Sequence, residues 1–426
     1  GQTGLPGGGV GYGYGSLGGV GAPQSLARSP ALPQGARPNR DFIPVARISD
    51  LLLHPGESFD YEGETRRYPD IRLVYWAGGN PFHHHQDLNR LRRAWERPQT
   101  IIVQDPVFTA TAARADIVLP ASTSLERNDL AGARRMDAIV AMHRAIAPLG
   151  QSRSDFAICS AIAERLGVGA AFTEGRDEMG WIAHLYEQTR SDAAERLHWE
   201  MPEFDAFWRA GHARTPTRAH YTYLADFRAD PAAHPLATES GRIVLGSARL
   251  AALDYADCRA HPAWIEPSEW LGAADARART PFHLISRQPA GKLHSQLDAE
   301  PLSALSKREG RETASLHPGD PARLGVTSGQ AVRLWNARGQ TIAIARADEG
   351  VREGVVVLPT GSWYSPIDHS DHALDLAGNP NVLTLDKGTS RYGQGCSAHT
   401  CLVAVEPFND HNLPRPTAIG APPAPA

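Results

Sequence analysis

Several features that mark common classes of protein are scarce in this chain of 426 residues. Its four cysteines, Cys159, Cys258, Cys396 and Cys401, include no C-x-x-C pair, which disfavours a zinc or iron–sulfur cage built from this chain alone. No uninterrupted apolar run reaches the ~18 residues of a membrane span. Lys and Arg number 43 against 47 Asp and Glu, so the positive field that binds nucleic acid is missing. We therefore expect no nucleic-acid partner and no membrane span.

Signatures of catalysis are also missing. No Ser–His–carboxylate arrangement and no pair of carboxylates can be defended from the sequence. The triplet 83–85 consists of histidines, but adjacent side chains cannot all face one ion. No G-x-G-x-x-G follows the first expected strand, which disfavours a Rossmann dehydrogenase. We predict neither catalytic residues nor metal ligands in this chain.

Glycine, in contrast, is abundant at the start of the chain, where it fills eleven of the first 21 positions. Glycine loses more backbone entropy than other residues on ordering, so the stretch resists both helix and strand. It has no charged segment followed by an apolar one, and we do not interpret it as a signal peptide. From composition it is a flexible leader or an internal loop of a longer protein.

Short apolar runs followed by polar turns indicate an α/β region. The runs cover residues 71–76, 100–103 and 117–119, with a helical pattern over 86–97. This alternation is typical of a parallel sheet wrapped by helices, in which loops at the carboxyl ends of the strands form the binding crevice. Asn80, Gln104 and Asp105 follow the first two runs directly. We expect them along one rim of the sheet.

Further along, the pattern predicts a helix over 154–166, helical structure over 177–208 and a strand over 242–245. Ser154 and Asp155 stand at the start of the first of these helices. Capping explains them without a ligand, although a carboxylate there could also accept the two N–H groups of a guanine edge. Spacing alone favours the cap.

Beyond residue 281 the pattern changes to closely spaced short strands, which predict a small, mainly β barrel. The strands are expected over 282–286, 331–336, 340–346, 355–358 and 401–405. Polar strings lie between them, and each is ordinary alone. Together they supply amide, imidazole and hydroxyl groups suited to a large polar cofactor.

The predicted fold class is α/β, with a doubly wound, mainly parallel sheet followed by a smaller, mainly β barrel. The expected boundaries are a Gly/Pro-rich loop and connector over 1–41, an α/β domain over 42–270, the barrel over 271–412 and a Pro/Ala-rich tail over 413–426.

Ten stretches of this sequence resemble the C-terminal half of molybdopterin oxidoreductases of the dimethyl sulfoxide reductase family, in the branch of biotin sulfoxide, trimethylamine N-oxide and dimethyl sulfoxide reductases. They run in family order: GQTGLPGGGVGYGYG, IPVARISDLL, VYWAGGNPFHHHQDLNRL, ADIVLPASTSLERND, SRSDFAICSAIAERLG, KLHSQLD, GRETASLHPGD, NARGQ, GNPNVLTLDKGTS and QGCSAH. The first would then be an interior loop of a protein about twice as long.

The resemblance implies a bis(molybdopterin guanine dinucleotide) cofactor whose molybdenum cycles between Mo(VI) and Mo(IV) while an S-oxide or N-oxide loses oxygen as water. It also makes the barrel the molybdopterin dinucleotide-binding domain. The cofactor contacts it implies are Asn80, His84, Gln104, Asp105, Asp155, Ser286, Arg287, Gln288, His294, Ser295, Gln296, Asn381 and Gln394.

One departure from the family matters. In this branch a serine of the N-terminal half binds molybdenum, and no matching stretch occurs here, so the chain alone is expected to be inactive. Implied partners are the missing N-terminal half, a small S-oxide or N-oxide and an electron donor protein or quinol-linked cytochrome, in a bacterial cytoplasm or periplasm. The alternatives are a formate dehydrogenase-like molybdopterin enzyme and a non-catalytic cofactor-binding remnant.

Overall fold

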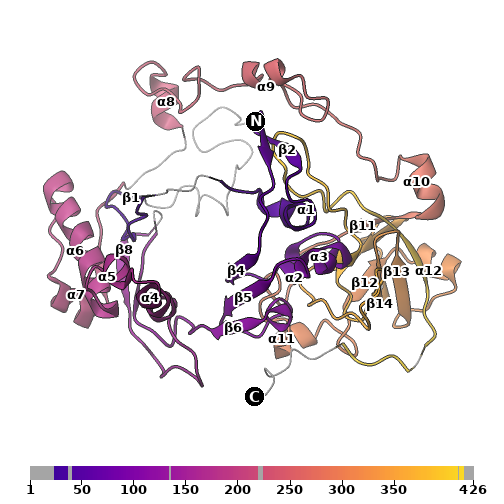
Figure 1. Ribbon diagram of the computed structural model, residues 1–426. Helices are drawn as coiled ribbons and strands as arrows, with labels where there is room; N and C mark the ends of the chain where they lie inside the picture. The colour runs from indigo at the N-terminus through magenta and orange to yellow at the C-terminus, as the bar shows by residue number, and fades with distance from the viewer. Residues whose placement is uncertain (1–23, 37–40, 134–135, 219–223, 411, 417–426) are drawn as a thin grey trace. The chain divides into compact units, whose positions relative to one another are not determined.

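The computed structural model describes residues 24–36, 41–133, 136–218, 224–410 and 412–416 (Figure 1). The chain forms two compact units, one from Gly1–Arg40 and Pro120–Leu245 and the other from Asp41–Leu119 and Gly246–Ala426. The glycine-rich start and most of the tail lie outside the described residues. The expected domain boundaries stay predictions.

The first unit combines short antiparallel sheets with helices. Its elements are β1 (Gln24–Ser25), β7 (Asp129–Ala131), β8 (Ala138–Met142), α4 (Asp155–Arg165), α5 (Gly169–Thr173), α6 (Glu178–Leu197), α7 (Phe204–Ala210), β9 (His212–Arg214), β10 (Thr217–Arg218) and α8 (Ala225–Ala229). Strands β7, β8 and β9 form one sheet, and β1 pairs with β10. Tyr186 and Phe207 stack in the core with their ring centroids 4.0 Å apart.

The capped helix predicted over 154–166 is confirmed, because Ser154 Oγ accepts the Ala157 N–H at 3.2 Å at the start of α4. The helical prediction over 177–208 is confirmed in part. Helix α6 ends at Leu197 and is followed by His198, which has a left-handed φ of 49°, and α7 begins only after Pro202.

The strand predicted over 242–245 is wrong. This segment has irregular backbone, and Leu245 is 81% exposed. A strand needs a neighbour to accept its backbone hydrogen bonds, and none of the described strands pairs with this run.

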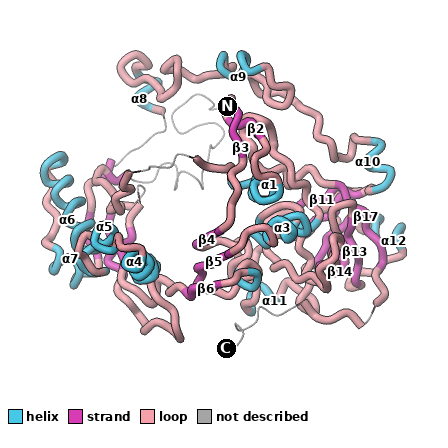
Figure 2. Tube along the Cα trace, in the orientation of Figure 1, coloured by secondary structure: helices cyan, strands magenta, loops and turns pink. Residues whose placement is uncertain are grey.

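The second unit begins with an α/β part. Its elements are η1 (Val45–Arg47), α1 (Ile48–Leu53), β2 (Ser58–Tyr61), β3 (Glu64–Arg67), β4 (Leu73–Ala77), α2 (Pro81–His84), α3 (Leu88–Trp95), β5 (Thr100–Asp105), η2 (Ala112–Arg114) and β6 (Ile117–Pro120), followed after the first unit by α9 (Ala248–Leu253) and α10 (Ala274–Arg279). Strands β4 and β5 pair in parallel, as predicted, with Ala77 opposite Gln104. Helix α3 lies beside them (Figure 2) and contributes the fully buried Leu88 and Leu91 to the same core cluster as Val103.

The remainder of this unit is a closed barrel. Its elements are β11 (Phe282–Ile285), α11 (Pro301–Ala304), β12 (Thr313–Leu316), α12 (Gly319–Leu324), β13 (Ala331–Trp335), β14 (Gln340–Ala347), β15 (Val355–Val357), β16 (Leu374–Asp375), η3 (Pro380–Val382) and β17 (Leu402–Pro407). The sheet order β12-β15-β11-β17-β13-β14 closes through a parallel β12–β14 pairing, so the predicted barrel is confirmed. Strand β12 was not predicted.

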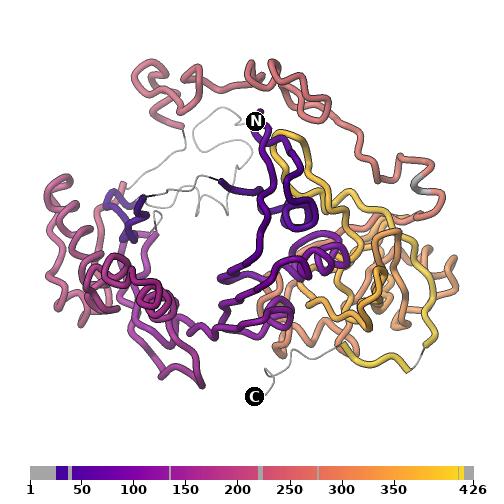
Figure 3. Tube along the Cα trace, viewed as in Figure 1, coloured from indigo at the N-terminus to yellow at the C-terminus, as the bar shows by residue number. Residues whose placement is uncertain are grey.

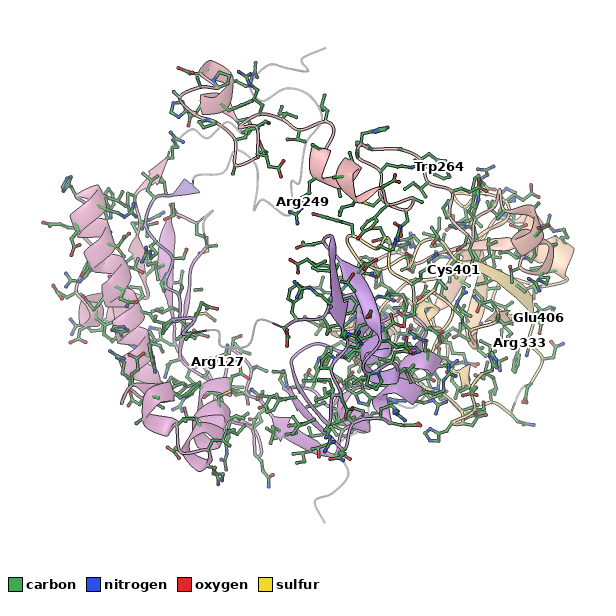
Figure 4. The ribbon with its side chains drawn as sticks, turned by 45° about the horizontal axis from the view of Figure 1, so that its top comes forward. Arg127, Arg249, Trp264, Arg333, Cys401 and Glu406 are labelled. Atoms are coloured by element: carbon green, nitrogen blue, oxygen red, sulfur yellow. The ribbon has the colours of Figure 1, made fainter. Side chains whose placement is uncertain are left out.

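Two details show how the strands of the barrel are joined. Strand β14 is shared, because its first two residues pair with β16 and its last four pair with β12. Arg333 of β13 and Glu406 of β17, both labelled in Figure 4, form an ion pair across neighbouring strands.

None of the helices in the described ranges combines the length and apolarity that a bilayer crossing requires.

Segments far apart in the sequence lie side by side in this unit. Figure 3 shows the indigo hairpin β2–β3 beside yellow chain from the barrel region. Gln394 Nε2 donates to the Asp60 carbonyl at 2.8 Å, and Glu62 N–H donates to the Tyr392 carbonyl at 2.9 Å. The hairpin is therefore attached to chain more than 300 residues away.

Gly378 provides a test of how tightly the loop after β16 is packed. It has a φ of +82°, and a Cβ there would lie 2.8 Å from Glu312 Cβ and 3.3 Å from the Ile342 carbonyl oxygen. Gly378→Ala should lower the free energy of unfolding by about 3 kcal/mol, since strain and overpacking add. Urea titration of the chain measures this.

Gly325→Ala is the matched control, because Gly325 has a φ of +69° but open space around its missing Cβ. It should cost only about 1 kcal/mol of backbone strain. Equal losses of unfolding free energy in the two variants would show that the close approach of Glu312 adds no cost to the substitution at Gly378.

Candidate functional site

The turn after β4 is the first part of the candidate site. Gly78 and Gly79 have φ values of 70° and 79°, which explains the glycine pair. Gly78 N–H donates to the Gln104 carbonyl at 2.9 Å, extending the β4–β5 ladder beyond the strand end. Asn80 and Gln104 therefore lie at the same edge of the sheet, as the sequence predicted.

Three buried nitrogen atoms around this turn lack a hydrogen-bond partner among the described residues. They are Asn80 Nδ2, Trp76 Nε1 and His83 Nδ1. The other end of the Asn80 amide is engaged, because its Oδ1 accepts from Thr111 Oγ1 at 2.7 Å. Leaving buried polar groups unpaired is costly, typically ~1–3 kcal/mol each. Such a set suits a ligand rich in hydrogen-bond acceptors, of the kind that a pterin or a phosphate presents.

The histidine triplet separates into different environments. His83 and His85 are buried, whereas His84 is exposed. Burial is the main cause that lowers the pKa of His83 to about 3, with smaller contributions from the charges of His84 and Lys292, so this ring is neutral at pH 7. No group of three or more His, Cys, Asp or Glu side chains that could hold a metal ion occurs in the part of the chain that the structure describes.

His85 is held in place by the Asp386 carboxylate. The Asp386 carboxylate lies 3.3 Å from His85 Nε2, 2.7 Å from Arg90 Nη1 and 3.0 Å from Arg47 Nη2. Burial alone would raise the pKa of Asp386, but the hydrogen bond from His85 and the charges of His85, Arg47 and Arg90 outweigh it and lower the pKa to about 2. This ionised cluster anchors the end of the histidine turn.

Asn381 joins the histidine turn to the barrel region. Its Nδ2 donates to the His83 carbonyl at 2.6 Å, and its Oδ1 accepts from Thr384 Oγ1 at 2.9 Å. Its loop is held by the fully buried Asp375, which accepts from Thr341 Oγ1 at 2.6 Å and from Asn379 N–H at 2.8 Å. The amide of Asn381 thus already has partners within the protein.

Two loops of the barrel region form a further part of the site. Gln288, which follows β11, has its Nε2 2.6 Å from His294 Nδ1, so the predicted contact residues 286–288 and 294–296 meet at this pair. Thr360 N–H donates to the Arg287 carbonyl at 2.9 Å, and Trp363 Nε1 donates to the Ser295 carbonyl at 2.8 Å. Ser286 is half-buried, and Gln296 is exposed.

Two further predicted residues have hydrogen-bond partners of their own. Asp105 accepts from the Val107 N–H at 2.9 Å in a tight turn, and burial raises its pKa. Gln394 is engaged with the hairpin β2–β3.

Asp155 belongs to the first unit, where it borders a cavity of about 410 Å³. Phe156 and Trp181 supply aromatic faces to this cavity, and Asn128 Nδ2 is bound by Glu178 at 3.0 Å on its wall. Arg127, labelled in Figure 4, also lines it. A carboxylate and two aromatic rings are thus among the groups that line this cavity.

Sequence reasoning missed His83, Trp76 and Asp386. From the sequence, the triplet is rejected as a metal site and only its middle member, His84, is kept as a cofactor contact, whereas the structure buries His83 and His85 and exposes His84. Asp386 had no local signal, because it meets His85 across 301 positions of sequence.

Two family models match the sequence. Residues 4–165 match a molybdopterin oxidoreductase model, and residues 282–402 match a molybdopterin dinucleotide binding domain model.

Curated relatives include a biotin sulfoxide reductase of Cereibacter sphaeroides, 64% identical over 95% of this chain and 54% of the relative. A dimethyl sulfoxide/trimethylamine N-oxide reductase of the same organism is 45% identical over 96% of this chain and 51% of its own length. A trimethylamine-N-oxide reductase of Haemophilus influenzae is 40% identical over the same shares. The chain spans about half the length of these relatives.

Among solved structures, acetylene hydratase from Pelobacter acetylenicus matches with a TM-score of 0.64 at 16% identity, over 85% of this chain and 46% of that protein. This similarity concerns the fold alone.

Asp386→Asn tests the anchor of the histidine turn. The variant should lower the free energy of unfolding at pH 7 by about 3 kcal/mol, since the guanidinium groups of Arg47 and Arg90 lose one of their two carboxylate partners and keep Asp50. The pKa of Asp386 falls from its ordinary 3.8 to about 2 on folding, so its stabilisation is present above about pH 4 and is lost as the pH falls through 2. The difference from the parent should therefore narrow between about pH 4 and pH 2 in urea titrations.

Asp371→Asn is the control. Asp371 pairs with Arg93 at 2.9 Å, but both side chains are exposed, and the change should cost less than about 1 kcal/mol. A deficit in the Asp386 variant that stayed constant across the acid range would contradict the assignment.

Proposed function

The chain belongs to the molybdopterin oxidoreductases of the dimethyl sulfoxide reductase family, and we propose that it is the C-terminal, cofactor-holding part of a molybdenum-dependent reductase of S-oxides or N-oxides. The observation that carries the proposal is the 64% identity to a biotin sulfoxide reductase over 95% of this chain. Relatives named for trimethylamine N-oxide and dimethyl sulfoxide support the wider substrate class.

The family implies a molybdenum–molybdopterin cofactor, and we propose its bis(molybdopterin guanine dinucleotide) form. When bound, this group supplies the two-electron redox chemistry that removes oxygen from the substrate. The buried donors Asn80 Nδ2 and Trp76 Nε1 would hold acceptor atoms of the group. In the first unit, Asp155 would accept the N–H groups of a guanine in its cavity, beside Trp181.

The remaining proposed contacts are polar side chains of the second unit that lie in its loops, in η3 or at the ends of α2 and β5. They are His84, Gln104, Asp105, Ser286, Arg287, Gln288, His294, Ser295, Gln296, Asn381 and Gln394. Asn381 acts in this proposal mainly by fixing the backbone at His83, because its amide already bonds there.

The residues of this chain bind and orient. His83 is neutral at pH 7 because its pKa is about 3, so it is unsuited to exchanging a proton with a substrate at that pH. Asp386 stays ionised within its cluster of cations. We therefore assign no catalytic acid or base to the chain.

We propose that the rest of the polypeptide completes the enzyme, since the relatives are about twice as long. It would supply the molybdenum ligand and the substrate funnel. A separate electron donor protein or quinol-linked cytochrome would complete turnover, in the cytoplasm or the periplasm.

The test uses the full-length protein that contains this sequence. It should hold about one molybdenum per chain by mass spectrometry of the metal. It should also oxidise reduced viologen only when biotin sulfoxide, dimethyl sulfoxide or trimethylamine N-oxide is added. Full activity without molybdenum would overturn the proposal. Formate oxidation in place of S-oxide or N-oxide reduction would identify a formate dehydrogenase-like enzyme. A protein that binds the cofactor but turns over none of these substrates would be a non-catalytic binding remnant.

Asn80→Ala tests the free donor. It should lower the molybdenum content of the full-length protein about ten-fold, equivalent to ~1.4 kcal/mol of lost binding. Asn89→Ala is the control, because Asn89 is a buried amide of α3 whose Oδ1 accepts from Tyr364 Oη at 2.7 Å and whose Nδ2 donates to the Arg338 carbonyl at 3.2 Å. The control should lose stability and keep its molybdenum. Equal metal loss in both variants would remove Asn80 from the set of contacts.

A further inference from the structure

Four charged side chains form a buried cluster in the second unit. Lys292 Nζ lies 2.5 Å from both Asp298 Oδ1 and Glu312 Oε1, and Lys307 Nζ lies 2.5 Å from Asp298 Oδ1. Lys292 and Glu312 are each only 1% exposed, and Asp298 is 6% exposed. Two cations balance two carboxylates, and Ser362 Oγ donates a further hydrogen bond to Glu312 at 2.8 Å.

This charge cluster lies at both ends of the loop 293–297, which carries three of the proposed cofactor contacts. Lys292 and Asp298 flank residues 293–297 on either side, and Glu312 at the start of β12 binds Lys292 from outside the loop. The two ends of the loop are thus fastened to each other and to the barrel.

The enclosed loop has a strained backbone. His294 and Leu297 have φ values of 52° and 63°, a left-handed region that costs a non-glycine residue ~1 kcal/mol or more. Such conformations persist where surrounding contacts over-determine them, and they cluster at ligand-holding sites.

Neighbouring contacts fix the loop further. A Cβ on Gly361 would lie 2.1 Å from the His294 carbonyl oxygen, so backbone passes directly against backbone there. The indole Nε1 of Trp363 donates to the Ser295 carbonyl at 2.8 Å. The backbone N–H of Trp363 donates to Asp298 Oδ2 at 3.4 Å. The side chain of His294 is left to meet Gln288 at 2.6 Å.

Stability alone does not account for so many buried charges. An apolar cluster of equal volume is often as stable as a buried ion-pair network, while removal of one partner is strongly destabilising. A charged cluster does, however, specify one geometry, because each ammonium must meet its carboxylate.

We propose that Lys292 and Glu312 are positioning residues that fix the 293–297 loop, with His294 held against Gln288, before the cofactor binds. The inference rests on the proposed function for the identity of the ligand. The loop restraint itself concerns the protein alone and can be measured without the cofactor.

The first test is hydrogen exchange in the chain with Glu312→Gln, which keeps the shape but removes the charge. Amides of residues 291–298 should exchange about ten-fold faster than in the parent, equivalent to ~1.4 kcal/mol of local stability. Amides of β13 and β14 report global stability as an internal reference.

Asp320→Asn is the matched control. Asp320 is another fully buried carboxylate of the barrel, and its Oδ2 accepts the Gly354 N–H at 2.9 Å. It should change global exchange without selective exchange at 291–298. A loop that stays protected in the Glu312 variant, or that opens equally in the Asp320 variant, would overturn the proposal.

The second test measures molybdenum and guanine content in the full-length protein, well below its unfolding temperature. Glu312→Gln should lower both several-fold, and Asp320→Asn should keep them. Normal content in the Glu312 variant would overturn the positioning role. If the parent holds no molybdenum, the proposed function fails, and the exchange comparison alone decides whether the loop is restrained by the cluster.

Discussion

A buried carboxylate must be surrounded by donors, and this requirement organises the second unit. Asp375, Asp386 and Glu312 each lie away from solvent, and each is satisfied by groups from distant parts of the chain. The free energy of transferring an unpaired charge from water would be prohibitive. Each carboxylate therefore determines where several loops must pass.

The three carboxylates act on different parts of the proposed site. Asp386 contacts His85, and Asp375 holds the loop that carries Asn381. Glu312 pairs with Lys292, at one end of the loop that carries His294. The same unit holds donors such as Asn80 Nδ2 that have no hydrogen-bond partner among the described residues. The arrangement separates the groups that build the cradle from those available to a ligand.

Local features of the site could be predicted from the sequence. The Ser154 cap, the α3 core positions and the turn that places Asn80 beside Gln104 depend on residues close in sequence or on adjacent parallel strands. The contact between Asn381 and His83 could not be predicted, because it joins residues 298 positions apart. Nor could the run at 242–245 be rejected, since its residue types suit a strand and only the absence of a neighbouring strand among the described residues excludes it.

The shared strand β14 couples barrel assembly to the proposed site. Thr341, near its start, holds Asp375 of β16, and its later residues close the barrel through β12. A shift of β14 by two residues would keep the same side chains facing inward, so hydrophobic burial alone would resist it only weakly. It would, however, strip Asp375 of the Thr341 hydroxyl. The hydrogen bond to buried Asp375 thereby favours the native register of β14. A barrel with a shifted β14 would also misplace the Asn381 loop.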